Sequence, residues 1–360
     1  MKIAFFHELT SLSGARKVVE EYGRILSKEH EVDLYYVDDI EDAIVSSIFN
    51  KVYYFKFAGS KSRIYRDSIG LIRLFFLHKK IAKIMQDKDY DFVFISPSKF
   101  TQAPFLLRMT KKTIYFCQEP LRMVYDPIFR LPEDLNYFKK LYEKINRLSR
   151  KVIDKNNISK AKIVLANSLF SKENIKKAYG INAIVCYLGV DTDKFKPVRT
   201  NKFTDILFIG EKENIEGFDL FENTMTLYKK KPLFSFVSRD AKGIGINEDS
   251  LVNEINKAKI ALSLSKSEPF GLIPIESMAC EAPVIAVNEG GFKESVINGK
   301  TGFLIERKPE ELKDKIDLLL SDDKLRAQMG ENGRKLVLDK FTWVKSANRF
   351  LNIAKTIMKS

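Results

Sequence analysis

The stretch LSKSEPFGLIPIESMACEAPVIAVNEGGFKESVINGKTGFL, residues 264–304, decides the fold predicted for this chain. Short apolar, β-prone segments at residues 259–264 and 282–287 read as two buried strands. Between them, a loop at residues 265–271 leads into a helix expected over residues 273–280, where a proline in the first turn is tolerated. Such a strand–loop–helix–strand unit is typical of a parallel sheet, whose ligands lie beyond the carboxyl ends of the strands.

Two carboxylates in this stretch are candidate ligand contacts. Glu268 lies in the loop and Glu276 in the helix, with seven residues between them. Because an ionised carboxylate only accepts hydrogen bonds, we expect Glu268 to bind sugar hydroxyls and Glu276 to bind the two hydroxyls of a ribose. The N–H groups of Phe270, Gly271 and Leu272, at a helix N-terminus, favour a diphosphate. The alternative is an ordinary βαβ unit with two surface glutamates.

These residues resemble the donor-site signature of the retaining glycosyltransferases of family four. Besides the E-x7-E pair, the resemblance rests on Ser267-Glu268-Pro269-Phe270-Gly271, on Gly290-Gly291 with Glu294, and on Asn298-Gly299-Lys300-Thr301-Gly302. It implies a GT-B fold, in which two Rossmann-like α/β domains face each other across a cleft and a C-terminal helix crosses back to the first domain. It also implies retaining transfer of a sugar from a nucleotide-diphosphate sugar to a glycan, glycolipid or lipid-linked acceptor, with no metal and no cofactor.

The length of 360 residues suits two domains, each large enough to bury its own core. By the resemblance, residues 1–184 form an N-terminal acceptor-side domain, residues 185–340 a nucleotide-sugar-binding domain, and residues 341–360 the returning helix. Residues 132–160 read as a charged, helix-prone connection. Further strands are expected at residues 2–7, 31–37, 90–96, 112–117, 161–166 and 205–210. Further helices are expected at residues 15–28, 62–85, 170–179 (with Ser168 as N-cap), 309–320, 322–338 and 344–358.

Four residues of the first half are also candidates for the site. His7 ends the first expected strand, at the edge where ligands bind. Gly14 lies in a segment that resembles the family's first glycine loop, which approaches the donor diphosphate. Gln118 stands where some members have a histidine over the sugar, and its neutral amide can bond a hydroxyl but cannot exchange a proton near pH 7. Arg122 contacts a phosphate of donor or lipid acceptor, or else forms a structural ion pair.

Two acids depart from the family pattern. Glu211 and Glu216 stand where the family has an arginine and a lysine that neutralise the donor diphosphate. Lys212 and Arg239 are the nearby candidates to replace those cations. The alternative function is therefore a non-catalytic GT-B descendant that binds nucleotide or sugar as a scaffold.

The net charge of +14 is unevenly distributed, since residues 1–180 hold 33 Lys and Arg against 21 Asp and Glu. Residues 51–80 contain eight basic residues, one acid and seven interleaved aromatic residues. A basic amphipathic helix of this kind is attracted to an anionic membrane surface, and the alternative is a solvated basic face. Charge alone also allows nucleic acid, but no recognition motif supports it, so no nucleic-acid partner is expected.

The three cysteines, Cys117, Cys186 and Cys280, are odd in number and far apart, which favours neither disulfides nor a metal site. Asp191-Thr192-Asp193 reads as a turn, the alternative being a metal-binding D-x-D. The N-terminal residues lack the apolar region of a signal peptide, and no run of 18 apolar residues exists. We therefore expect a cytoplasmic protein, peripheral at the inner face of the membrane.

Overall fold

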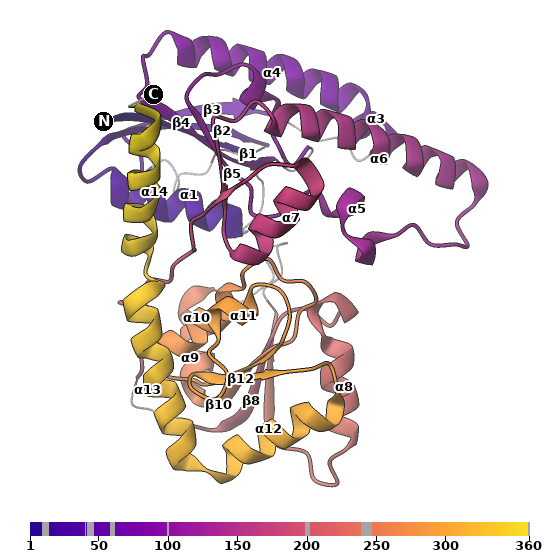
Figure 1. Ribbon diagram of the computed structural model, residues 1–360, viewed down its shortest axis with the longest axis vertical. Coiled ribbons are helices and arrows are strands. Elements are labelled where there is room, and N and C mark those ends of the chain that lie inside the picture. The colour runs from indigo at the N-terminus through magenta and orange to yellow at the C-terminus, as the bar shows by residue number, and fades with distance from the viewer. Residues whose placement is uncertain are drawn as a thin grey trace. The chain divides into compact units, whose positions relative to one another are not determined.

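Two parallel sheets lie at the centres of two compact units in the computed structural model, as Figure 1 shows. Unit 1 consists of residues 1–167, 171–186 and 347–360, and unit 2 of residues 168–170 and 187–346. The sequence places the boundaries at 184/185 and 340/341. The structure describes residues 1–8, 14–39, 41, 47–57, 62–98, 101–198, 202–238 and 247–358.

Unit 1 is built on a seven-stranded sheet in the order β3-β2-β1-β4-β5-β6-β7, with every pairing parallel. Its strands are β1 (Lys2–Glu8), β2 (Glu31–Asp38), β3 (Lys51–Lys56), β4 (Phe92–Ser98), β5 (Thr113–Phe116), β6 (Ile163–Ala166) and β7 (Ile184–Val185). Its helices are α1 (Gly14–Leu26), α3 (Arg63–Asp67), α4 (Ile69–Gln86), η1 (Phe105–Arg108), α5 (Arg122–Tyr125), η2 (Pro127–Phe129), α6 (Tyr137–Ile158) and most of α7 (Leu169–Tyr179).

Unit 2 is built on a five-stranded parallel sheet in the order β12-β11-β10-β8-β9. Its strands are β8 (Thr204–Ile209), β9 (Phe234–Val237), β10 (Ala258–Ser263), β11 (Val284–Val287) and β12 (Gly302–Ile305). Its helices are η3 (Asn214–Glu216), α8 (Phe218–Thr226), α9 (Glu248–Lys257), α10 (Leu272–Ala279), α11 (Phe292–Ser295), α12 (Pro309–Ser321) and α13 (Asp323–Lys340).

The last helix, α14 (Trp343–Met358), enters unit 1 from Ala347 onward. Its Phe350 is fully buried against the rings of Tyr22 and Phe94, with centroid distances of 5.1 and 5.2 Å. The central strands are near-continuous apolar runs, as expected where helices cover both faces of a parallel sheet. The predicted α/β architecture with a returning C-terminal helix is therefore confirmed.

The single helix expected over residues 62–85 is wrong, because the chain breaks at Ser68 between α3 and α4. Ser68 has non-helical dihedrals of φ −123° and ψ −88°, and its hydroxyl donates to the carbonyl of Ile64 at 2.6 Å. A serine that bonds the preceding turn competes with the helical backbone bonds, which propensity alone does not reveal.

Within the described ranges, no helix is both long enough and apolar enough to cross a bilayer.

The strand orders define where ligands are expected. In unit 1 the chain order reverses between β1 and β4, and in unit 2 it reverses between β8 and β10. In open parallel sheets, ligands bind beyond the carboxyl ends of the strands at such reversal points. The candidate residues that lie at these two edges are therefore the ones positioned to contact a ligand.

Candidate functional site

At the reversal point of unit 2, a hydrogen bond joins the loops that follow β8 and β10. The Ser265 hydroxyl donates to Glu216 Oε2 at 2.8 Å, and the Lys266 N–H donates to the Ile215 carbonyl at 2.7 Å. Gly217 makes this approach sterically feasible: its φ is +78°, and an added Cβ would lie 2.1 Å from the Leu264 carbonyl oxygen. The edge is thus tightly packed, and Glu216 is part of its structure.

The backbone of Glu268 is fixed by the glycine pair that follows β11. The Gly291 N–H donates to the Glu268 carbonyl at 2.8 Å. Gly290 has φ +56°, and a Cβ there would lie 2.4 Å from the same carbonyl oxygen. Ser267, just before Glu268, holds the sparsely populated left-handed conformation at φ +52°. The half-buried Glu268 side chain therefore lies on a loop at the sheet edge, and several contacts fix the backbone conformation of that loop.

Phe270 and Gly271 place the N-terminus of α10 beside that loop. The Phe270 ring is 1% exposed and packs on Tyr187 and Phe341, with centroid distances of 6.1 and 5.8 Å. Gly271 is the N-cap at φ +81°, and a Cβ there would lie 2.4 Å from the Phe292 ring. Phe270 thus anchors the loop through its side chain, while only the backbone at 270–272 is available for the expected diphosphate contacts.

Glu276 lies in the middle of α10 and is 1% exposed. Burial, and secondarily the Glu276 charge, raise the pKa of Cys280 to about 12. The two glutamates of the E-x7-E pair therefore differ in exposure: Glu268 is half-buried on the loop, whereas Glu276 is buried on α10.

Lys212 and Arg239 are the cations expected to replace the family's arginine and lysine, and the structure describes the first of them. Lys212 is exposed, with its ammonium 5.1 Å from the centroid of Phe236 and 5.9 Å from that of Phe218. Glu211 accepts a hydrogen bond from the Ser238 hydroxyl at 2.5 Å. Arg239 lies outside the described residues.

Arg307 is a residue of this edge that the sequence reasoning missed. Its guanidinium forms a two-pronged pair with Glu289, at 2.7 and 3.0 Å, and donates to the carbonyls of Leu264 and Ser265 at 2.9 and 3.0 Å. It thereby ties the end of β10 to the segment after β11. The available signal was its position just after a strand, which places an arginine at the carboxyl edge of a parallel sheet.

The glutamate of the Gly-Gly-Phe-x-Glu turn has a structural role within unit 2. Glu294 accepts hydrogen bonds from the N–H groups of Leu169 and Phe170, at 2.8 and 2.9 Å. The hydroxyl of Ser168, the predicted N-cap, donates to the Pro269 carbonyl. The N–H groups of Leu169 and Phe170 in the first turn of α7 are thus satisfied by a carboxylate distant in sequence.

At the reversal point of unit 1, His7 on β1 meets Ser96 on β4. The Nδ1 atom lies 2.9 Å from the Ser96 hydroxyl, and the ring stacks on Tyr36 at a centroid distance of 5.9 Å. Burial, assisted by the charge of Arg16, lowers the pKa of His7 to about 3. The imidazole is consequently neutral near pH 7 and has no proton to donate as an imidazolium.

Gly14 and Gln118 lie together at the same edge of unit 1. A Cβ on Gly14 would sit 3.8 Å from Gln118 Oε1, an ordinary contact. Arg122, four positions further along the chain, forms an ion pair with Asp126 at 3.1 Å and lies 3.7 Å from Glu119. The central carbon of its guanidinium also lies 4.9 Å from the centroid of the Phe129 ring. These contacts support the structural ion pair for Arg122 over a dedicated phosphate contact.

The Asp191-Thr192-Asp193 segment forms a turn. The Asp191 carboxylate accepts from the N–H groups of Asp193 and Lys194, at 3.0 and 3.2 Å. In the described part of the chain, no three His, Cys, Asp or Glu side chains converge as a metal site requires. Asp191 therefore acts as an Asx-turn residue.

Comparison with known proteins bears directly on this edge of unit 2. The family model for glycosyl transferases group 1 matches residues 243–336, which include the Glu268 loop, α10 and the glycine pair. The chain is 30% identical to an uncharacterized glycosyltransferase of Methanocaldococcus jannaschii. That match covers 51% of this chain and 56% of the relative, so it spans little more than half the length of the relative.

Two solved structures resemble the whole chain. Sucrose-phosphate synthase from Thermosynechococcus elongatus superposes with a TM-score of 0.74 at 18% identity, covering 99% of both chains. The Anabaena HepE protein, solved with UDP-glucose, superposes with a TM-score of 0.71 at 16% identity, covering 99% of this chain and 100% of that one. At such identities the likeness shows the fold alone, which is GT-B.

Proposed function

We propose that the chain is a member of the glycosyl transferases group 1 family, whose model matches residues 243–336, and that it transfers a sugar from a nucleotide-diphosphate sugar to a glycan, glycolipid or lipid-linked acceptor. We assign the donor to unit 2 and the acceptor to unit 1. The proposal includes retention of the anomeric configuration and needs neither a metal nor a cofactor. The HepE structure contains UDP-glucose, which makes a uridine donor the first to test.

The observation that carries the proposal is the construction of the Glu268 loop. Gly290 packs on the backbone of Glu268, and Gly291 packs on the backbone of Pro269 and Phe270, so closely that no side chain fits at either position: a Cβ would lie 2.4 Å from Glu268 O at Gly290 and 2.5 Å from Pro269 O at Gly291. Ser267 is held at a positive φ beside it. A fold retains strained, tightly fixed backbone of this kind where a side chain must be positioned accurately.

The proposed chemistry follows from these groups. As the bond between sugar and diphosphate breaks, negative charge grows on the leaving phosphate oxygens. We assign its stabilisation to the N–H groups of residues 270–272 at the start of α10 and to the Lys212 ammonium. Glu268 orients the sugar by accepting hydrogen bonds from its hydroxyls, and Glu276 is assigned to the ribose.

On the acceptor side, Gln118 beside Gly14 is assigned a hydrogen bond to a sugar hydroxyl. We further propose that residues 51–80 hold the protein against an anionic membrane surface, as a peripheral protein of the cytoplasmic face. Arg73, Lys79 and Lys80 of α4 are exposed, which supports that contact.

The proposal is tested by following nucleotide release. The protein is incubated with UDP-, GDP- and ADP-sugars and anionic lipid extracts, with and without EDTA, and products are identified by mass spectrometry. We expect one donor series to yield free nucleoside diphosphate and a glycosylated lipid or glycan, unaffected by EDTA. Nucleotide binding without any release would favour the non-catalytic scaffold.

A further inference from the structure

Helix α6 is oriented with its polar face inward and its apolar face outward. Five apolar side chains on it are between 44% and 77% exposed: Phe138, Leu141, Ile145, Leu148 and Val152. Their spacing of three and four residues places them on one stripe of the helix. The buried positions are mostly polar, namely Glu143, Asn146, Arg150, Asp154 and Asn157. This is the reverse of the arrangement expected for a helix covering a water-soluble core.

Hydrogen bonds from the polar face fix this orientation. Asp67 of α3 accepts from the Tyr142 hydroxyl at 2.8 Å and the Asn146 amide at 3.1 Å, and it pairs with the Arg150 guanidinium. Asp154 accepts from the Ala103 N–H at 2.8 Å. Turning the apolar stripe inward would bury it at the cost of several buried polar groups losing their partners. The exposed stripe is therefore a stable property of unit 1.

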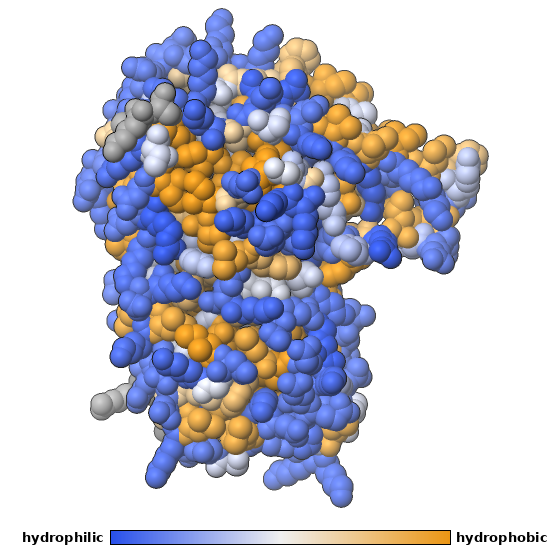
Figure 2. All heavy atoms as spheres, viewed as in Figure 1, coloured by the Kyte–Doolittle hydropathy of each residue, from blue (hydrophilic) through white to orange (hydrophobic). Residues whose placement is uncertain are grey.

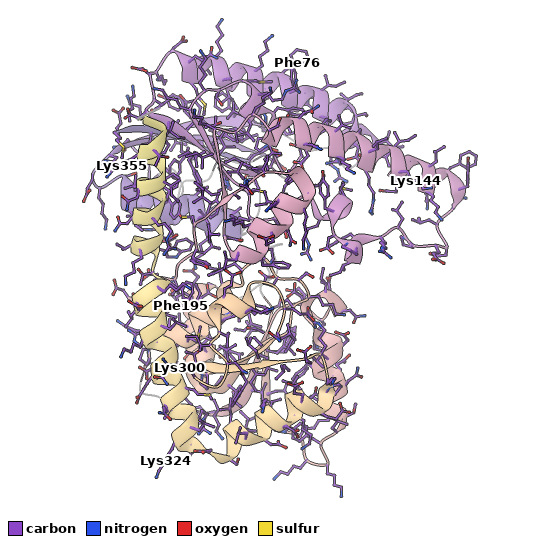
Figure 3. The ribbon with its side chains drawn as sticks, in the orientation of Figure 1. Phe76, Lys144, Phe195, Lys300, Lys324 and Lys355 are labelled. Atoms are coloured by element: carbon purple, nitrogen blue, oxygen red, sulfur yellow. The ribbon has the colours of Figure 1, made fainter. Side chains whose placement is uncertain are left out.

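The neighbouring helices α3 and α4 continue the same character. Ile64, Ile69, Ile72 and Phe76 are between 49% and 68% exposed. Figure 2 shows hydrophobic atoms gathered over the projecting end of this part of unit 1, and Figure 3 labels Phe76 on α4 and Lys144 on α6. We call the exposed apolar residues of α3, α4 and α6 the apolar face.

Exposed lysines accompany the apolar face, and the three helices α3, α4 and α6 themselves carry no exposed acid. Exposed lysines on α6 are Lys139, Lys144, Lys151 and Lys155. The two acids of α6, Glu143 and Asp154, are buried, α4 contains none, and the one acid of α3, Asp67, is engaged by Arg150. An apolar stripe bordered by lysines is the arrangement that inserts into the headgroup region of an anionic bilayer.

We propose that the apolar face, with α6 as its main element, inserts into the interface of an anionic lipid bilayer. The inference rests on the membrane contact proposed above for residues 51–80, and it identifies the segment that enters the lipid. A second copy of the chain is the competing occupant, but two such faces would bring lysines against lysines. Acidic phospholipid headgroups instead complement them.

The test is flotation with vesicles of phosphatidylglycerol and phosphatidylcholine, compared with phosphatidylcholine alone. The variant Leu141→Ser/Ile145→Ser/Leu148→Ser changes three exposed positions, so we expect normal folding by circular dichroism and at least tenfold weaker binding to the anionic vesicles. The matched control, Leu233→Ser/Ile297→Ser/Leu338→Ser, removes three exposed apolar side chains from unit 2 and is expected to bind as the wild type. Unchanged binding by the α6 variant overturns the inference.

Two further measurements separate this inference from the proposed function. Lys79→Glu/Lys80→Glu tests the membrane contact of residues 51–80; if it releases the protein while the α6 variant does not, the inference fails and the contact stands. Analytical ultracentrifugation tests the competing occupant, since a dimer abolished by the α6 serine variant would overturn the lipid assignment. Neither readout depends on sugar transfer, so failure of the donor assay leaves the inference intact.

Discussion

The Ser265 hydroxyl and the Glu216 carboxylate form a hydrogen bond of 2.8 Å across the reversal point of unit 2. This bond explains how an acid is accommodated where the family resemblance implies a lysine. Glu216 joins the turn after β8 to the loop that leads to Glu268. Its carboxylate lies close to the edge where we place the donor diphosphate, and the expected repulsion between these two anions can be tested.

Replacing Glu216 by glutamine should strengthen nucleotide binding. The amide keeps an acceptor for Ser265 but removes a charge that repels a diphosphate, and a unit charge several ångströms away contributes about 0.5–2 kcal/mol. We therefore expect the Kd for the preferred nucleoside diphosphate to fall roughly 2-fold to 30-fold in calorimetry. Ser265→Ala is the control, since it removes the bond and retains the charge. An unchanged or weaker affinity of Glu216→Gln would place the diphosphate elsewhere.

Replacing Glu268 by alanine should separate chemistry from binding. The carboxylate is assigned to the sugar, so its loss should lower kcat about 100-fold, the scale of removing one well-placed electrostatic contact. Nucleotide affinity should change less than about threefold, which is under 0.7 kcal/mol. Glu331→Ala, at an exposed position on α13 of the same unit, serves as the control. Full activity of Glu268→Ala would remove this residue from the site.

Replacing Gly290 by alanine should destabilise the protein more than replacing Gly299. Both have positive φ, at +56° and +72°, but a Cβ at Gly290 meets the Glu268 carbonyl at 2.4 Å, whereas nothing lies within 4 Å at Gly299. The shared backbone strain costs about 1 kcal/mol, and the clash adds roughly 1–3 kcal/mol. Thermal unfolding should therefore show a clearly lower Tm for Gly290→Ala. Equal Tm values would mean that the glycine turn is not tightly packed.

The buried His7 should make stability depend on pH. Its folded pKa of about 3 lies below the unfolded value of 6.5, so the unfolded chain binds more protons between those limits. The stability contributed by neutral His7 is complete above pH 6.5 and is lost as the pH falls, by up to about 1.4 kcal/mol per unit. Between pH 7 and 4, the Tm of wild type should fall more steeply than that of His7→Gln. Parallel slopes would contradict burial of a neutral imidazole.

Long periodic or apolar segments were predictable from the sequence. The strands around residues 2–7 and 31–37 and the helix at 344–358 are present nearly as expected, because continuous apolar runs identify buried parallel strands. The Glu268 loop and the start of α10 were also anticipated, since proline and glycine mark them.

Features that depend on distant partners were not predictable. Residues 132–160 read as a charged, helix-prone connection, and they contain the 22-residue helix α6. Periodicity shows that such a helix has two faces but not which one is buried, and here Asp67 decides it through Asn146 and Arg150. Likewise, nothing local to Ser168 indicates that Glu294, more than a hundred residues away, caps α7.

Calorimetric titration of UDP, GDP and ADP into wild type and Glu276→Ala tests the donor site on unit 2 most directly. We expect one nucleotide series to bind the wild type and to bind the variant at least tenfold more weakly, because Glu276 is assigned to the ribose. Glu268→Ala should retain most of the affinity in the same titration. Binding that both glutamate variants leave unchanged, or no binding of any nucleotide, would contradict the assignment of the donor to this edge.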